Sequence, residues 1–379
     1  MKIKTQIVNG LESRWLAPAY SGWLLGGLAL FFFMAATNTL SGWLYVISGV
    51  MAALLAIAAA LSARNLQNIQ VVRRPIYPVS AGDDLTVELL VQNGSSKPKS
   101  LLQVSDLIPH VLGEPITKVV EILNTDNPQY WVYQIATRRR GVYQWQTVQV
   151  RSAAPLGLFW GRRSQTVAAR AIVYPTVLPL SRCPLVDDMG RESSLQINSD
   201  RRAQSATEGI TRSLRPYRWG DSTRLIHWRS SARYGELRIR ELERFTGGQE
   251  LIVCLDSAAS WSLESFEEAV IAAASLYFYA AHQHLNIRLW TARTGLIQGE
   301  KSVLEVLAAV DAGEEVQTGE LPRLPLVWLT QNSASLPSLP EGSRWVLWQP
   351  ELHEKPIAPG ILIRGDRALQ AQLQDAPGF

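Results

Sequence analysis

The chain has 379 residues, 47% of them hydrophobic and 13 of them Trp, which excludes a mostly disordered protein. Its two Cys exclude a disulfide scaffold and a four-thiolate zinc site, and its formal net charge of +4 is too small to indicate nucleic-acid binding by itself. At about 150 residues per domain, the length predicts two or three domains.

The first 64 residues predict a membrane-spanning helical hairpin. From Trp15 to Ala63 there is no Asp, Glu, Lys, Arg or His. Turn-forming residues at 37–42 divide this stretch into two segments, about 19–36 and about 43–62, each close to the roughly 20 residues that span a bilayer. Basic residues flank both ends, so the positive-inside rule places both termini and the soluble domains in the cytoplasm. A cleaved signal peptide is one alternative, but the apolar stretch is long for a signal, and two buried helices of a soluble protein are the other, which the uncharged length disfavours.

Residues 65–180 predict an all-β sandwich of the immunoglobulin-like type. Short β-rich segments recur between turn-forming Gly, Asn, Asp and Pro, without a helical period of useful length. We find no catalytic motif here and interpret the domain as a spacer or an interaction module. The polar stretch 181–208 that follows is interpreted as a linker.

Residues 209–379 predict an α/β domain with a doubly wound sheet. The continuous apolar run 251–255 ends at Asp256, as a buried parallel strand does, and a segment with helical spacing follows at 262–282. Further strand-like and helical segments alternate to the end of the chain. Because ligands of such sheets bind at the carboxyl ends of the strands, we expect Asp256 and the loop after it to lie at the working edge.

The segment from Arg201 to Arg244 contains 11 Arg, no Lys and 5 acidic residues, interspersed with Trp and Tyr. The use of Arg alone indicates planar, bidentate or stacked contacts. We favour a folding network wrapped against the α/β sheet, in which Asp221 pairs with an Arg and Trp228 is largely buried. A partner-docking surface is the second interpretation. A nucleic-acid groove comes last, because acids dilute the charge and no recognition motif accompanies it, so we expect no nucleic-acid partner.

Residues spread over 209–241 form a long signature, which consists of Arg215, Tyr217, Gly220, Asp221, Arg224, Trp228, Ser231, Ala232 and Arg233. This signature resembles that of the domain of unknown function 58 family, and the resemblance extends to the segment 155–159 and to the two-helix start. It implies a membrane-anchored protein whose C-terminal part is similar to a von Willebrand factor A domain. It also implies a MoxR-type AAA+ ATPase as a partner.

Domains of the von Willebrand factor A type often bind a divalent metal through an Asp-x-Ser-x-Ser motif. The matching positions here are Asp256, Ala258 and Ser260, so the middle serine is missing. The distal loop offers Thr330 but no acid. One carboxylate and one hydroxyl rarely hold Mg²⁺, so we expect a degenerate, metal-free site and no cofactor.

No familiar catalytic motif is present: the sequence lacks a Walker A loop, a His-Glu-x-x-His motif and a Gly-x-Ser-x-Gly elbow. Cys183 is a candidate nucleophile only with a His nearby in space, and Cys254 lies inside an apolar strand. We therefore predict a non-enzymatic, membrane-anchored adaptor or assembly factor that contacts membrane lipid and protein partners. The alternative is a hydrolase or another enzyme with its site in the crevice near Asp256.

Overall fold

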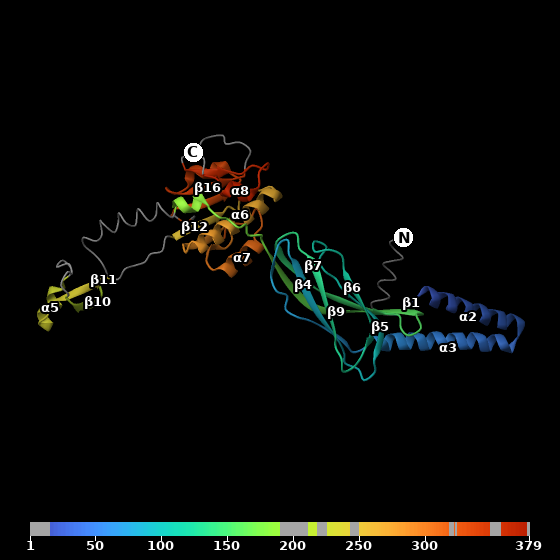
Figure 1. Cartoon of the computed structure of the whole chain (residues 1–379). Coiled ribbons are helices and arrows are strands. Elements are labelled where there is room, and N and C mark those ends of the chain that lie inside the picture. Colours follow the sequence, from blue (N-terminus) through green and yellow to red (C-terminus); the bar gives the residue numbers. More distant parts are fainter. Residues whose placement is uncertain are drawn as a thin grey trace. The chain divides into compact units, whose positions relative to one another are not determined.

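Figure 1 shows the computed structural model of the chain. It describes residues 16–189, 211–217, 226–242, 250–317, 322, 324–348 and 358–376. The chain divides into two compact units, Met1–Tyr174 and Pro175–Phe379. The first unit holds two apolar helices and a β-rich region, and the second holds a small lobe and an α/β region.

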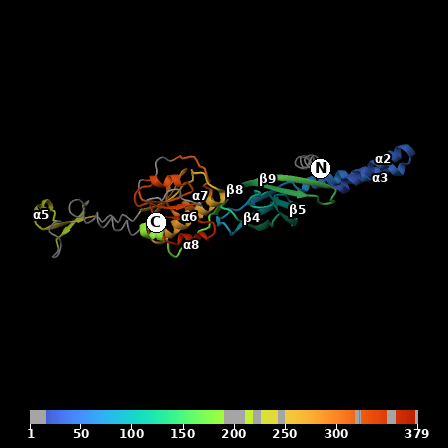
Figure 2. The same cartoon turned by 90° about the horizontal axis from the view of Figure 1, so that it is seen from above.

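Two apolar helices, α2 (Tyr20–Thr39) and α3 (Gly42–Asn65), lie side by side as a hairpin (Figures 1 and 2). Both are long and apolar enough to cross a membrane. Small buried residues join them, since Ser48 Oγ donates a hydrogen bond of 2.9 Å to the carbonyl oxygen of Ala29. Each helix runs three residues past its predicted end, because no Pro or Gly stops the helix there.

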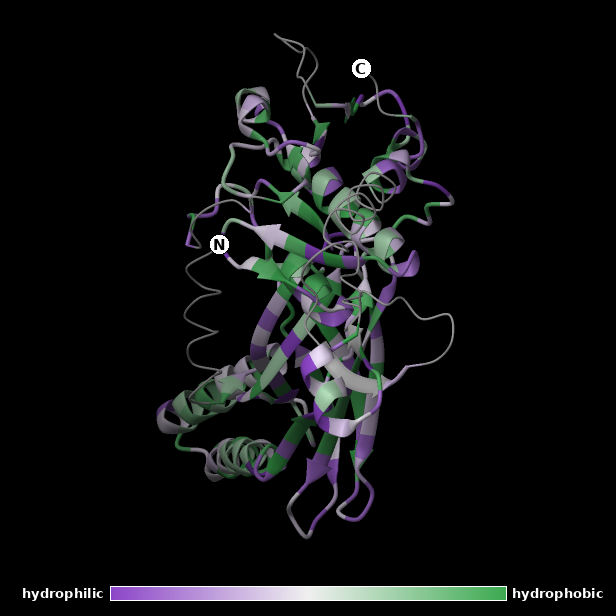
Figure 3. Cartoon of the chain, turned by 90° about the vertical axis from the view of Figure 1, so that its left-hand side faces the viewer, coloured by the Kyte–Doolittle hydropathy of each residue, from purple (hydrophilic) through white to green (hydrophobic). Residues whose placement is uncertain are grey.

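The hairpin is apolar along its length, as its hydropathy shows (Figure 3). It exposes large side chains that the core helix of a soluble protein would bury, among them Trp23, Leu30, Phe31, Met34, Trp43, Val46 and Val50. A contiguous apolar surface of this kind marks a contact with a membrane or with another protein.

The β-rich region consists of two sheets that share one core. The larger sheet has the strand order β1-β9-β8-β5-β6, with β3 beside β9, and the smaller sheet has the order β2-β4-β7. The bounds are β1 Ala17–Pro18, β2 Ile69–Arg73, β3 Val79–Ser80, β4 Asp84–Asn93, β5 Lys99–Asp106, β6 Ile116–Leu123, β7 Gln129–Ala136, β8 Gly141–Ser152 and β9 Phe159–Tyr174. Alternate residues of both sheets face this core, including Val87 and Leu89 of β4 and Leu102 and Val104 of β5. The prediction of a β-rich domain is confirmed, and its immunoglobulin-like type stays a prediction.

A buried polar network, which the sequence analysis missed, joins the two sheets. Asp106 at the end of β5 has no exposed surface. Its carboxylate accepts hydrogen bonds from Arg73 Nη2 (2.6 Å), Tyr133 OH (2.5 Å) and Trp145 Nε1 (3.0 Å). Arg73 and Tyr133 belong to the smaller sheet, whereas Asp106 and Trp145 belong to the larger one. The network therefore fixes the register of one sheet against the other.

The α/β region is built on one sheet with the strand order β14-β13-β12-β15-β16-β17. All neighbours pair in parallel except β13 and β14. The bounds are β12 Glu250–Leu255, α6 Leu263–His282, β13 Asn286–Thr291, β14 Gly295–Ile297, α7 Glu300–Ala309, β15 Leu326–Thr330, η2 Ser333–Ser338, β16 Arg344–Leu347, β17 Gly360–Leu362 and α8 Leu369–Leu373.

Both faces of this sheet are buried, which explains the continuous apolar strands. One face packs in a core with α6, α7 and α8, and the other packs three Trp, at 290, 328 and 345, with Leu336 of η2. These elements confirm an α/β region. The doubly wound, von Willebrand factor A-like assignment stays a prediction.

Residues 183–189 correct the predicted linker at 181–208. Residues 184–189 are helical, and Cys183, Leu185, Val186 and Met189 are buried in the larger α/β core. The acidic pair at 187–188 makes this stretch look solvated in the sequence. However, the Asp187 carboxylate accepts hydrogen bonds from Tyr279 OH (2.9 Å) and from the backbone N–H of Cys183 (3.2 Å). The remainder, 190–208, lies outside the described residues.

Candidate functional site

The carboxyl ends of the parallel strands meet at Asp256, as the sequence predicts for a working edge. The backbone N–H of Asp256 donates to the carbonyl oxygen of Leu329 (3.0 Å), and its carboxylate Oδ2 accepts from Thr330 Oγ1 (2.7 Å). The carboxylate also accepts from the backbone N–H of Ala259. Burial raises the pKa of Asp256, and these two hydrogen bonds oppose the rise. Asp256 thus fastens its own loop to the end of β15.

Ser257 fastens two further loops to the same edge. It is fully buried, and its Oγ accepts a hydrogen bond from the backbone N–H of Ala292 (3.0 Å) after β13. Its carbonyl oxygen accepts from the backbone N–H groups of Gly313 (2.8 Å) and Glu314 (3.0 Å). The strand-end polar atoms are therefore engaged in holding loops together. In the sequence, Ser257 lies beside the missing motif serine, and nothing there assigns it a role.

The expected metal ligands are only partly assembled. Asp256 and Thr330 are in contact, but Ser260 and Ala258 are exposed. Within the part of the chain that the structure describes, no group of three or more His, Cys, Asp or Glu is placed to hold a metal. Mg²⁺ needs near-octahedral oxygen ligands, and this set supplies one carboxylate that already accepts two hydrogen bonds. These residues supply fewer oxygen ligands than a divalent-metal site of this type needs, and the absence of a metal stays a prediction.

An aromatic cluster closes the edge beside Asp256. Trp261 Nε1 donates to the carbonyl oxygen of Asp256 (2.6 Å), and its ring lies 5.7 Å from that of Trp348 and 5.6 Å from that of Phe266. Trp348 Nε1 donates to Glu268 Oε2 (3.1 Å). The rings and the half-buried acid pack together next to Asp256.

Neither cysteine supports the enzyme alternative. Cys183 and Cys254 are buried free thiols. Burial raises the pKa of Cys183 to about 12 and raises that of Cys254 well above its ordinary value. Because the thiolate is the nucleophile, burial disfavours both thiols in that role.

The signature segment forms a small lobe, which we define as residues 211–217 and 226–242. It consists of β10 (Thr211–Pro216) and β11 (Arg238–Leu242), paired antiparallel, with helix α5 (Trp228–Tyr234) between them in sequence (Figure 1). Ser231 is buried and ties the helix to the strand, since its Oγ accepts from the backbone N–H of Arg238 (2.9 Å) and donates to the carbonyl oxygen of His227 (3.1 Å). This role accounts for a serine at this signature position.

Trp228 lies on the outer surface of α5, so the prediction that it is buried is wrong. Its side chain is 67% exposed, whereas we predicted that it is largely buried. The reason is that α5 turns Ser231 toward β11, which leaves Trp228 and its neighbours outside. Tyr234 is 58% exposed and Leu237 44% exposed, and the guanidinium carbon of Arg238 lies 4.1 Å from the centroid of the Tyr234 ring.

The other signature positions fall into three groups. Ala232 and Arg233 are exposed, and Tyr217 is half-buried, with its backbone N–H donating to the carbonyl oxygen of Leu237 (2.8 Å). Arg215 lies in β10, but its side chain is outside the description. Gly220, Asp221 and Arg224 lie outside the described residues. The ion pair of Asp221 and the packing of the lobe against the α/β sheet therefore stay predictions.

The chain thus combines an apolar helical hairpin, a β-rich region and an α/β region that carries the signature lobe. Residues 213–317 match the family described as "Protein of unknown function DUF58", which supports the resemblance drawn from the signature. No curated protein matches the chain.

Several solved structures are similar to parts of the chain at low identity. One is a CARDB domain from Pyrococcus furiosus, at 12% identity over 27% of this chain and 93% of that chain, with a TM-score of 0.20. Another is a β-glucosidase from Listeria innocua, at 12% identity over 29% of this chain and 16% of that chain, with a TM-score of 0.18. A third is the complex of zinc 2-glycoprotein with prolactin-inducible protein from human seminal plasma, at 14% identity over 28% of this chain and 94% of that chain, with a TM-score of 0.18. At such TM-scores the likeness carries no argument.

Proposed function

We propose that the chain is a membrane-anchored, non-enzymatic adaptor that binds an acidic protein surface through the outer face of α5. The observation that carries the proposal is the 67% exposure of Trp228 on a helix that also exposes Arg229 and Arg233. Trp, Tyr and Arg dominate the binding energy of protein interfaces, and a folding network would have buried this Trp. The excess of Arg between Arg201 and Arg244 favours a partner of opposite charge.

The anchor in this proposal is the helical hairpin. Phe31 and Val50 are each 64% exposed on helices of 20 and 24 residues, which suits lipid and not water. Arg64 at the end of α3, followed by Arg73 and Arg74, keeps this end on the cytoplasmic side by the positive-inside rule. We infer that both termini and the soluble regions are cytoplasmic.

The α/β region serves as a scaffold in this proposal. Its strand order and the position of Asp256 suit a von Willebrand factor A-like domain, and we infer that it works without metal because its edge is tied together by Asp256, Ser257 and Thr330. The enzyme alternative places chemistry at the same edge, where the described polar groups bond loops instead. The family resemblance makes a MoxR-type AAA+ ATPase the first partner to test.

The test compares Trp228→Ala with Tyr77→Ala, which removes another highly exposed aromatic, 82% exposed, from the first unit. Full-length protein in lipid nanodiscs is titrated with the MoxR-type ATPase of the same organism. We expect Trp228→Ala to weaken binding about thirtyfold, as removal of a hot-spot side chain worth about 2 kcal/mol does, and Tyr77→Ala to leave it unchanged.

Two controls separate docking from folding. The melting temperatures of both variants should equal that of the wild type, because neither side chain is packed in a core. A photo-crosslinking amino acid at position 228, but not at position 77, should form adducts with a protein in cells. A lowered melting temperature for Trp228→Ala without any adduct at 228 restores the folding-network interpretation.

A further inference from the structure

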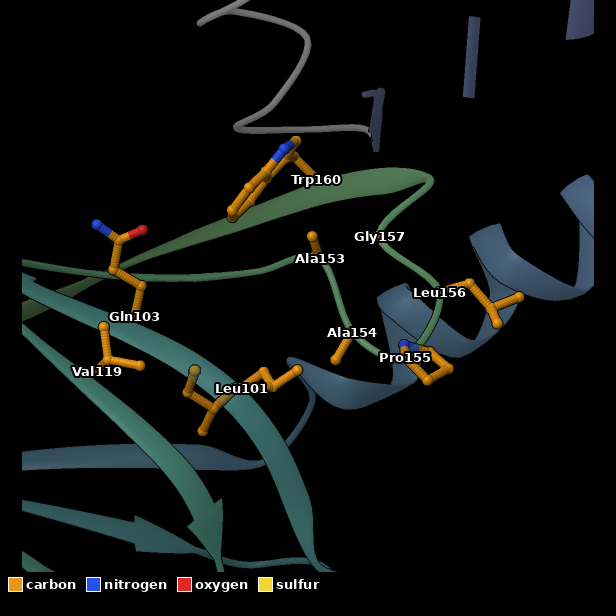
Figure 4. A pocket seen from close by; sticks show the side chains of 10 residues that line it. Leu101, Gln103, Val119, Ala153, Ala154, Pro155, Leu156, Gly157 and Trp160 are labelled. Carbon is orange, nitrogen blue, oxygen red and sulfur yellow. The ribbon is translucent and has the colours of Figure 1, made fainter. Parts of the chain in front are cut away.

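A cavity of about 440 Å³ opens on the outer face of the larger sheet (Figure 4). Its walls come from Leu101 and Gln103 of β5, Val119 of β6, Trp160 of β9 and the loop at 153–157. Leu101 is 56% exposed and Val119 62% exposed, so the cavity offers apolar side chains to whatever lies outside it. We call it the hairpin-end cavity.

The loop that lines this cavity continues to Leu158, and this segment, 153–158, is hydrogen-bonded to the ends of both apolar helices. The backbone N–H of Ala19 donates to the carbonyl oxygen of Leu158 (2.8 Å), immediately before α2. Ser21 Oγ donates to the carbonyl oxygen of Gly157 (3.0 Å), and Ser62 Oγ donates to that of Ala154 (2.9 Å). The loop therefore lies level with the first turn of α2 and the last turn of α3. When the hairpin spans a bilayer, this level is the membrane–water interface.

Two arginines lie next to the cavity, in the sheet row of Gln103. Gln103 is paired across the sheet with Val119 and with Arg151, and Arg151 is paired with Arg162 on β9. Directly paired residues share one face of a sheet, so both arginines lie on the face of the cavity. The guanidinium carbon of Arg151 lies 5.2 Å from the centroid of the Trp160 ring, which lines the cavity.

The change from apolar to basic side chains runs along the strands, away from the hairpin. β5 begins beside α3, where Lys99 Nζ donates to the carbonyl oxygen of Arg64 (2.7 Å) and Asn65 Nδ2 donates to that of Ser100 (2.8 Å). Leu101 is thus nearer the hairpin than Gln103 and its paired arginines. Leu101 lies toward the membrane side, and the guanidinium groups lie further along the strands toward the aqueous side, which is the order of an acyl chain and a phosphate in a leaflet.

We propose that the hairpin-end cavity binds an anionic phospholipid of the surrounding leaflet. The upper acyl segment contacts Leu101 and the loop at 153–157, and Arg151 and Arg162 bind the phosphate, for which paired guanidinium groups are well suited. This inference rests on the membrane anchoring proposed above. It adds a specific lipid site at the foot of the β-rich region.

The test uses the full chain in phosphatidylcholine vesicles that carry a trace of photoactivatable phosphatidylglycerol or of photoactivatable phosphatidylcholine. Adducts are mapped by mass spectrometry. We expect adducts on 99–106 and 153–163, with phosphatidylglycerol preferred at least about fivefold, because each basic residue near an anionic leaflet contributes about that factor. The double variant Arg151→Gln and Arg162→Gln should remove the preference. Arg170→Gln, a matched change of an exposed arginine elsewhere on β9, should keep it.

A second variant tests the cavity itself. Ala153→Phe fills the space, and it should abolish adducts of both lipids at 153–163 while the melting temperature and the adducts on α2 and α3 persist. Equal labelling by the two lipids, or an unchanged preference in the double arginine variant, overturns the lipid site alone. Absence of adducts on α2 and α3 overturns the anchoring and this inference with it.

Discussion

At the scale of single residues, the buried carboxylate of Asp106 should be costly to remove. Asp106→Ala leaves the Arg73 guanidinium, 2% exposed, without its carboxylate partner. Breaking a buried pair in this way costs about 3–5 kcal/mol of unfolding free energy. Removing the exposed Glu88 from its pair with Arg74 should cost about 1 kcal/mol or less. Denaturant unfolding of the two variants in detergent micelles measures both values, and equal midpoints would contradict the central role of Asp106.

The burial of Asp256 predicts how the stability of the protein depends on pH. Burial raises its pKa in the folded chain above the value of about 3.9 in an unfolded chain. Its protonation therefore contributes stability that is fully present below the unfolded pKa and is lost as pH rises through the folded one. Asp256→Asn keeps an acceptor for Thr330 and Ala259 without the charge. We expect the melting temperature of the wild type relative to this variant to fall as pH rises from 4 to 8.

The same two proteins test the metal-free proposal. Added Mg²⁺ should leave both melting temperatures unchanged at neutral pH, because the donors near Asp256 do not complete an octahedral set. A rise of the melting temperature with Mg²⁺ in the wild type that Asp256→Asn lacks would establish a metal site.

The pH prediction has its own contrary outcome. If the melting temperature of the wild type relative to Asp256→Asn rose with pH, favourable contacts of the charged carboxylate would outweigh its desolvation.

At the scale of elements, the joint between α2 and the β-rich region depends on Gly22. A Cβ added there would overlap the carbonyl oxygen of Leu158, whereas one added at Gly27 of the same helix meets nothing within 4 Å. We expect Gly22→Val to displace the loop at 153–158 and to speed its amide hydrogen exchange at least about tenfold, as a local loss of about 1.4 kcal/mol does. Gly27→Val should leave the exchange of that loop unchanged. Equal exchange in both variants would contradict the joint.

Some helices and strands could be predicted from the sequence, and others could not. The two apolar helices follow from their uncharged length, and β12 with α6 follows from the apolar run that ends at Asp256. The two-residue strand β1 and the helical residues 184–189 carry no periodic signal, because one is too short and the other is interrupted by its acidic pair. Such elements exist through contacts with distant residues, which periodicity does not report.

Some features of the candidate site could be predicted from the sequence, and others could not. The position of Asp256 at a strand end and its proximity to Thr330 follow from the rule that parallel strands end at one edge. The burial of Ser257 and the exposure of Trp228 depend on how each loop or helix is rotated toward its neighbours. The sequence of a short helix such as α5 mixes charged and aromatic residues. It therefore has no apolar period that marks which face is buried.

At the scale of the whole molecule, the hairpin predicts a topology. Residues after Arg64 should be cytoplasmic, since the basic flanks lie on that side. Protease added to intact cells should leave the soluble regions uncut, and protease added to inverted membrane vesicles should digest them. A fluorescent protein fused after Phe379, which matures only in the cytoplasm, provides a second readout. Digestion from outside intact cells would contradict this orientation.

The loop at 153–158 has a mechanical consequence. Because the first turn of α2 and the last turn of α3 are both hydrogen-bonded to this loop, a force applied to the β-rich region loads both helices in parallel. In a bilayer, where we propose that the hairpin lies, the two helices would tilt or move as one unit, and neither would be drawn out ahead of the other. A machine that pulls on this region would have to extract the helices as a pair, so the resistance to extraction is close to the sum for two spans.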